Sequence, residues 1–297
     1  YYHLQTDGMP DYGVPTARKA PQLGNSAGIL DVGRSTFYGV LDRDYQKTRA
    51  DIGTLEVEHD FTERLTFSNA TRYGETLNDY VVTNPGDGTV SLDPTTNTYW
   101  LKRGTKSRWQ KSTLLSNVSQ LYGKFDTGNL KHSFNLGIEL TRETNKNASY
   151  AVNTTSGSAC PTSAGFSSTD LDCTPYLNPN PYDPWTGSIT RSALSQDATS
   201  TTRSIYAFDT IDLNERFQVS TGVRLDNYRI SGNYLTRGAT QPQSADGEWT
   251  MFNYQLGLVY KPAHNGSIYL SYATASTPPT ISGCLLYTSP SPRDRTR

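Results

Sequence analysis

The sequence predicts an all-β chain that forms part of an antiparallel transmembrane β-barrel. Three observations lead to this fold class. Apolar and polar residues alternate strictly in several segments, most clearly in LKHSFNLGIELTRE at 130–143. Short polar turns join such segments at one end, and long loops join them at the other. No segment approaches the run of about 18 apolar residues that a membrane-spanning helix needs.

The composition indicates that the apolar strand faces are not buried in an ordinary globular core. Only 34% of the 297 residues are apolar, and Tyr outnumbers Phe by 20 to 9. The mean hydropathy is −0.62, so the chain lacks the aliphatic residues that fill a core of this size. Lys and Arg (27) nearly balance Asp and Glu (28), which excludes the basic footprint of a nucleic-acid-binding protein.

Four short polar turns separate pairs of strand-like segments. They are DFTERL at 60–65, DTGNLK at 126–131, DLNERF at 212–217 and KPAHNGS at 261–267. Segments with strand-like composition flank each turn, as expected of β-hairpins. About eight strands are therefore expected, at 48–60, 64–83, 108–125, 131–152, 200–213, 216–234, 248–262 and 266–277.

Side chains of a strand alternate between two faces, and we expect the apolar face to meet lipid and the polar face to line a lumen. The residues expected to point outward are Phe134, Leu136, Ile138, Leu140, Phe217, Val219, Val223 and Leu225. Those expected to point inward are Asn135, Glu139, Gln218, Ser220 and Arg224. Segments 108–125 and 200–213 alternate too weakly for a face to be assigned. An aromatic girdle is expected from Tyr73, Tyr254, Tyr260 and Tyr272.

The connections at the other strand ends are long, at 5–47, 84–107, 153–199 and 235–247. A structureless loop as long as 153–199 would count against a compact domain. Outer-membrane barrels, in contrast, combine short periplasmic turns with long extracellular loops. The expected strands exceed the roughly 9–11 residues that span a bilayer, so they should project beyond the membrane.

Several segments resemble the barrel of TonB-dependent outer-membrane siderophore receptors, most of all the catecholate type. They are MPDYGVP (9–15), FYGVLDRDYQKTRADIGTLEVEHDF (37–61), LTFSNATRYGETLNDYVVT (65–83), GVRLDNY (222–228) and SIYLSYATASTPP (267–279). The resemblance implies a plugged barrel of about 22 strands in the bacterial outer membrane. It also implies uptake of a ferric siderophore without catalysis, driven by a TonB partner that acts on the plug. Iron would travel as part of the siderophore complex, so no cofactor is expected.

The sequence departs from the family pattern at both ends. The plug domain, the TonB box and the first and last barrel strands are not found in it, so residues 1–283 are interpreted as a mid-barrel segment. The tail CLLYTSPSPRDRTR (284–297) breaks the alternation and resembles translated sequencing-adapter sequence. We expect this tail, with Cys284, to be non-native; the alternative is the genuine start of an extracellular loop.

Cys160 and Cys173 lie close together in a loop rich in Ser, Thr, Pro and Gly. This spacing predicts a local disulfide, worth about 3 kcal/mol by the chain-entropy estimate, and hence an oxidising compartment. The alternative is two free thiols in a reducing cell.

Two loop segments are rich in aromatic residues. In NTYWLKRGTKSRWQK (97–111) the aromatic residues interleave with basic residues, and the second segment is TPYLNPNPYDPW (174–185). Ferric catecholates are anionic and aromatic, so basic groups beside aromatic faces suit them. The candidate ligand-binding residues are Tyr99, Trp100, Arg103, Lys106, Arg108, Trp109, Tyr182 and Trp185. The alternative is that these residues mark the barrel end, at the interface with lipid and lipopolysaccharide.

No motif for catalysis or metal binding has the context that its chemistry needs. GNSAG (24–28) matches a nucleophile-elbow pattern but lacks the required strand before it and helix after it. His3, His59, His132 and His264 are scattered without metal-ligand spacing. Glu139 and Asp226 are better read as part of a hydrated charge lattice with Arg72 and Arg224 than as a glycosidase pair. The remaining alternatives are a secreted all-β binding module or adhesin, and a polysaccharide-degrading β-enzyme.

Overall fold

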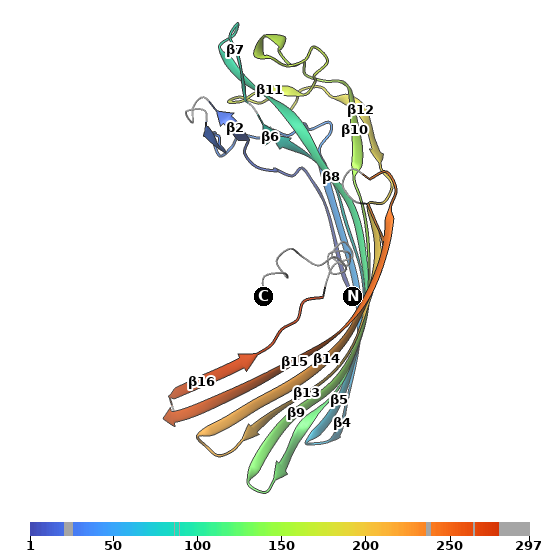
Figure 1. Ribbon diagram of the computed structural model, residues 1–297, viewed down its shortest axis with the longest axis vertical. Helices are drawn as coiled ribbons and strands as arrows, with labels where there is room; N and C mark the ends of the chain where they lie inside the picture. The colour runs from blue at the N-terminus through green and yellow to red at the C-terminus, as the bar shows by residue number, and fades with distance from the viewer. Residues whose placement is uncertain (21–25, 86, 89, 236–238, 264, 279–297) are drawn as a thin grey trace, which may run out of the picture.

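The computed structural model describes residues 1–20, 26–85, 87–88, 90–235, 239–263 and 265–278 (Figure 1). Its main element is an antiparallel sheet of 11 strands along the path β1-β4-β5-β8-β9-β13-β14-β15-β16, with β7 and β11 paired to the tip of β8. The strands on the path are β1 (Tyr2–Gly8), β4 (Tyr45–Thr62), β5 (Leu65–Pro85), β8 (Thr98–Thr127), β9 (Leu130–Ala148), β13 (Gln196–Asp212), β14 (Phe217–Tyr234), β15 (Gln243–Ala263) and β16 (Gly266–Ala273).

The four predicted turns connect neighbouring strands at one end of the sheet. Only Glu63 and Arg64 separate β4 from β5, and Gly128 and Asn129 separate β8 from β9. Gly128 has a φ of 62°, a left-handed conformation that glycine adopts without a steric penalty. In Figure 1 these hairpins lie together at the lower end of a curved, trough-shaped sheet. The predicted class, a partial antiparallel barrel with short turns and long loops, is confirmed.

The opposite end of the sheet carries a cap of loops and short strands (Figure 1). The cap contains η2 (Thr162–Ala164) and two small sheets that stand apart from the main one. Its strands are β2 (Thr16–Ala20), β3 (Ser26–Ile29), β6 (Asp87–Gly88), β7 (Ser91–Asp93), β10 (Tyr150–Ser156), β11 (Cys173–Pro175) and β12 (Thr186–Arg191). Of the two clusters of buried apolar side chains among the described residues, the larger also lies here.

Several strand boundaries differ from those expected, and three of them have a clear structural reason. β1 begins before residue 5 and runs into the segment expected to be a loop, because it pairs with β4 through its backbone while its side chains stay exposed. β8 begins at Thr98, inside the expected loop 84–107, because β7 and β11 pair with its tip. The expected strand 131–152 divides at Ala148, since β10 leaves the main sheet and pairs with β12.

The sheet has one apolar and one polar face through most of its length. Leu136 and Ile138 are 45% and 51% exposed, as expected of side chains that point outward. The register also assigns the strands whose faces the sequence left open. Leu121 of β8 lies opposite Leu136, and Ile205 of β13 lies opposite Ile138, so both belong to the apolar face.

The polar face carries an ion-pair network near the middle of the sheet. The Arg224 guanidinium contacts Glu139 Oε2 and Asp226 Oδ1, both at 2.9 Å. Ser204 donates to Asp226 and accepts from Arg224. These contacts support the predicted charge lattice for Glu139, Asp226 and Arg224. Arg72 is separate from it and donates to Thr54 Oγ1.

No helix in the described part of the chain is long and apolar enough to cross a membrane. The expected tail 284–297 and Cys284 lie outside the described residues, as do His264 and part of the GNSAG segment.

Candidate functional site

The tip of β8 divides the predicted ligand-binding segment between two faces. β8 pairs with β5 without a register shift from Leu65↔Gly123 to Pro85↔Arg103, so its side chains alternate along this stretch. Arg103 and Trp109 fall on the face that carries Leu121 lower in the strand. Lys106 and Arg108 fall on the opposite face, which carries Gln120 and therefore leads toward the lumen.

Tyr99 and Leu101 pack into the buried cluster of the cap. Leu101 is buried together with Leu30, Val90, Tyr38 and Tyr176, and Tyr99 packs against this group. The Tyr38 hydroxyl donates to the Tyr176 carbonyl oxygen. Burial raises the pKa of Tyr38 to about 12, so this phenol stays neutral and keeps its donated hydrogen bond. The cluster joins loop segments that are far apart in sequence.

Arg103 is part of the framework of the cap, since it is only 2% exposed. Its guanidinium donates to Asp183 Oδ2 at 2.8 Å and to the Asn180 carbonyl oxygen at 2.8 Å. A ligand could reach this guanidinium only if the loop around 180–183 moved away. As the loops stand, Arg103 fixes their position and does not face a ligand.

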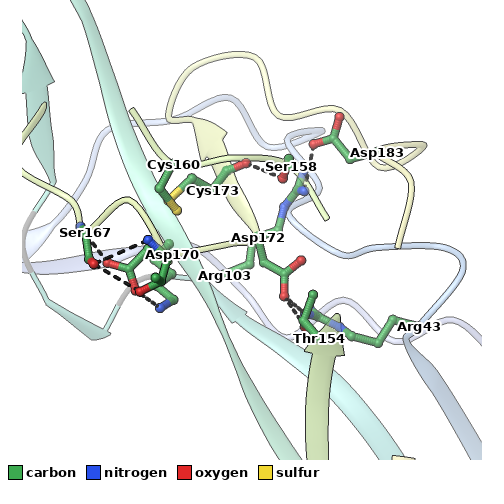
Figure 2. The surroundings of a disulfide bond; sticks show 12 residues. Arg43, Arg103, Thr154, Ser158, Cys160, Ser167, Asp170, Asp172, Cys173 and Asp183 are labelled. Atoms are coloured by element: carbon green, nitrogen blue, oxygen red, sulfur yellow. Dashed lines mark hydrogen bonds and ion pairs between the residues drawn. A yellow bond between two sulfur atoms is a disulfide. The ribbon is translucent and has the colours of Figure 1, made fainter. Parts of the chain in front are cut away.

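A second buried guanidinium, that of Arg43, joins three parts of the chain (Figure 2). It contacts Asp44 at 2.9 Å and Asp172 at 3.2 Å, and it donates to Thr83 Oγ1 at 2.6 Å. Asp172 also accepts from the Thr154 hydroxyl at 2.7 Å. These partners are up to 129 positions apart in sequence, and the network links the start of β4, the end of β5 and the loop after β10.

Cys160 and Cys173 form a disulfide next to this network (Figure 2). Cys173 follows Asp172, a non-glycine residue with a φ of 68°, and Asp172 donates its backbone N–H to the Ser158 carbonyl oxygen. The disulfide therefore restrains the loop that presents the Asp172 carboxylate to Arg43.

The opposite face of the β8 tip carries the exposed basic residues. Lys102 pairs with Asp170, and this hydrogen bond lowers the pKa of Asp170. Lys106 is exposed and has no ion-pair partner in the described part of the chain. Arg108 is exposed, and its only side-chain hydrogen bond in that part is a long one to Gln110, at 3.4 Å. Lys106 and Arg108 are about 7 Å apart along the strand.

The remaining predicted residues occupy different surroundings. Trp100 is half-buried, and its indole Nε1 has no hydrogen-bond acceptor among the described residues. Trp109 stacks against the Arg191 guanidinium at 4.4 Å. Trp185 donates to Thr154 Oγ1 at 2.9 Å, whereas Tyr182 is 78% exposed. The structure therefore does not bring all eight predicted residues into one site.

Sequence reasoning missed the residues that hold the cap together, namely Arg43, Asp44, Asp172 and Asp183. Each stands in a polar loop segment where a charged residue is unremarkable, and its partners are distant in sequence. Across the described residues, no group of three or more His, Cys, Asp and Glu side chains could hold a metal ion.

A curved antiparallel sheet with an apolar outer face, short turns at one end and an ordered cap at the other defines the wall of an outer-membrane β-barrel. The chain matches the family model described as TonB dependent receptor-like, beta-barrel, over residues 1–288. The chain belongs to this family and is part of a bacterial outer-membrane barrel.

The relatives include named siderophore receptors. The chain is 34% identical over 282 residues to the probable TonB-dependent siderophore receptor PiuA of Acinetobacter baumannii, which covers 94% of this chain and 37% of PiuA. It is 30% identical over 308 residues to the catecholate siderophore receptor Fiu of Escherichia coli, covering 94% and 38%. The crystal structure of PiuA aligns with a TM-score of 0.82 at 31% identity, covering 95% of this chain and 40% of that one. The chain thus spans well under half the length of these relatives.

Proposed function

We propose that the whole receptor takes up a ferric siderophore of the catecholate type across the outer membrane, without catalysis. The observation that carries this proposal is the likeness in sequence and fold to PiuA and Fiu, which are named as siderophore receptors. Energy would come from a TonB complex acting through a plug domain inside the barrel. Iron would be carried as cargo within the siderophore complex. Residues 1–283 supply barrel wall in this proposal, and 284–297 remain a proposed non-native tail.

The geometry favours Lys106 and Arg108 as the groups that meet an anionic chelate. Both are exposed on the face of β8 that leads toward the lumen, and neither is held in an ion pair within the described residues. Trp100 shares their face of the strand, and the exposed Tyr182 offers a further aromatic surface on the cap. Charge-assisted hydrogen bonds to catecholate oxygens are about twice as strong as neutral ones. Arg103 supports this surface indirectly by holding the loop at 180–183.

The test is uptake and binding by the full-length receptor in cells that lack their own siderophore receptors. The double variant Lys106→Ala/Arg108→Ala should raise the dissociation constant for a ferric catecholate about tenfold or more, since each charged hydrogen bond contributes about 1.5–3 kcal/mol. The matched control is Lys131→Ala, an exposed lysine beside a turn at the other end of the sheet. No uptake of any ferric catecholate by the wild type would contradict the function. Uptake with an unchanged dissociation constant in the double variant would contradict only the assigned residues.

A further inference from the structure

The apolar face of the sheet is not smooth, because Ala207 lies low among larger side chains. In register, Ala207 of β13 lies between Leu136 of β9 and Val223 of β14. The depression that results has a volume of about 520 Å³ and extends past Ile205 and Leu225. These strands lie in the middle of the described sheet, so both walls of the groove are complete.

A second depression continues the first toward the short turns. It has a volume of about 460 Å³ and shares Leu136, Ala207 and Val223 with the first. Phe134 and Asp209 line its far end. The two depressions therefore form one groove, apolar for most of its course and ending at a carboxylate.

Asp209 is an unusual residue for this face. It lies opposite Phe134 and Thr221 in register, and it therefore shares the outward face with the apolar band. Its Oδ2 lies 2.7 Å from His132 Nδ1, and the His132 ring stacks on Phe125 at 4.4 Å. The Asp209 side chain is still 25% exposed. His132 engages only Oδ2, and Oδ1 of Asp209 has no hydrogen-bond partner among the described residues, so a further donor for this carboxylate is expected.

We propose that this groove binds one phospholipid of the periplasmic leaflet, with an acyl chain over Ala207 and an ethanolamine headgroup at Asp209. The groove is continuous with the lipid-facing band, so hydrocarbon is the medium that surrounds it. Its polar end points toward the short turns, which lie on the periplasmic side in such barrels. An ammonium group complements the carboxylate, whereas an anionic headgroup is repelled by it. This inference rests on the membrane placement of the barrel and is independent of the transported ligand.

The test is native mass spectrometry of the full-length receptor in detergent, titrated with phosphatidylethanolamine and phosphatidylglycerol of identical chains. We expect the wild type to bind one phosphatidylethanolamine at least tenfold more tightly than phosphatidylglycerol. Ala207→Leu fills the groove and should weaken both lipids about tenfold. Asp209→Asn should remove the preference for ethanolamine while leaving phosphatidylglycerol binding unchanged or tighter.

Val57→Leu is the control, because it also enlarges an apolar side chain, at an exposed position of the outward face of β4 away from the groove. It should leave both affinities unchanged. If Ala207→Leu fails to form a folded barrel, the smaller change Ala207→Val takes its place. Equal affinities for the two lipids in the wild type would overturn the proposal. Equal effects of the groove and control variants would also overturn it. So would the retention of lipopolysaccharide, or of a second receptor copy, at the groove in place of phospholipid.

Discussion

Two buried arginines determine how the extracellular cap is held at the scale of single residues. Arg43 and Arg103 are 3% and 2% exposed, and each faces a carboxylate from the loop that follows β10. Removing one partner of such a pair leaves a buried charge without compensation, which is far more destabilising than losing a surface ion pair. The cap should therefore respond to these residues much more than to its exposed lysines.

Arg103→Leu should loosen the loop around 172–183 by about 3–5 kcal/mol of local stability, because Asp183 then loses its buried partner. Hydrogen exchange of the full-length receptor should show faster exchange in this loop and no change in β13–β15. Lys102→Ala is the control, since the Lys102–Asp170 pair lies at the surface and such pairs contribute about 1 kcal/mol or less. Equal exchange in the two variants would contradict the framework role of Arg103.

The loop should also loosen in acid through Asp170. The hydrogen bond from Lys102 lowers the pKa of this carboxyl below its ordinary value of 3.8. A lowered pKa in the folded state adds stability that is present above the unfolded value and is lost as pH falls through the folded value. Protection of residues 167–173 from hydrogen exchange should therefore decline more steeply below about pH 4 in the wild type than in Asp170→Asn. Parallel pH profiles for the two proteins would refute this role.

The sequence could indicate that charged and aromatic residues gather in these loops, but it could not pair them. The Arg43–Asp172 contact spans 129 positions, and no local pattern encodes such a distance. The same limit explains why Arg103 is a candidate ligand contact from sequence alone. The face of β8 on which Arg103 lies can be assigned only once β8 is known to begin at Thr98.

At the scale of strands, β5 and β8 carry a polar patch on the largely apolar outward face. It consists of Asn69, Thr71, Asn117 and Ser119, which hydrogen-bond to one another at 2.7–3.4 Å. Both carboxamides use their donors and acceptors within the patch. Burying a polar group in a hydrocarbon environment is unfavourable unless such bonds are made. Mutual satisfaction is therefore what allows these side chains to face lipid.

Asn117→Leu should destabilise the barrel by about 1–3 kcal/mol, because the Asn69 carboxamide loses both of its hydrogen bonds to Asn117 and keeps only those with Ser119 and Thr71. The double variant Asn69→Leu/Asn117→Leu should recover much of this loss, since both polar groups are then replaced by apolar ones. Urea unfolding of the full-length receptor in lipid vesicles measures the coupling between the two changes. Strictly additive effects would show that the two amides do not depend on each other.

Strand positions could be predicted from the sequence wherever a short turn and a clear alternation coincide. This holds for β9, β14 and β15, whose apolar residues recur at every second position. It fails for β1, whose side chains are all exposed, because its pairing depends on the backbone and leaves no apolar pattern. It also fails for β8 and β13, where polar residues such as Asn117 and Asp209 interrupt the outward face.

At the scale of the whole molecule, the chain forms a section of barrel wall that separates lipid from lumen. The apolar face presents residues such as Leu136 and Val223 to the membrane, and the polar face presents the Arg224 network to the lumen. On the lumen side the Tyr206 ring lies across Gly137, where an added Cβ would come within 2.2 Å of it. Large side chains thus lie flat against this wall, and the cap closes over its extracellular end.

The two faces of this sheet meet different media, lipid on the outside and water in the lumen. The direct measurement is the accessibility of nitroxide labels placed one at a time at Leu136 and Glu139 in the full-length receptor in liposomes. These residues lie on opposite faces of β9 near the middle of the sheet. Oxygen dissolved in lipid should relax the label at position 136 more strongly, and a water-soluble nickel complex should relax the label at position 139 more strongly. Higher accessibility to the nickel complex at 136 than at 139 would contradict the assignment of lipid and lumen faces.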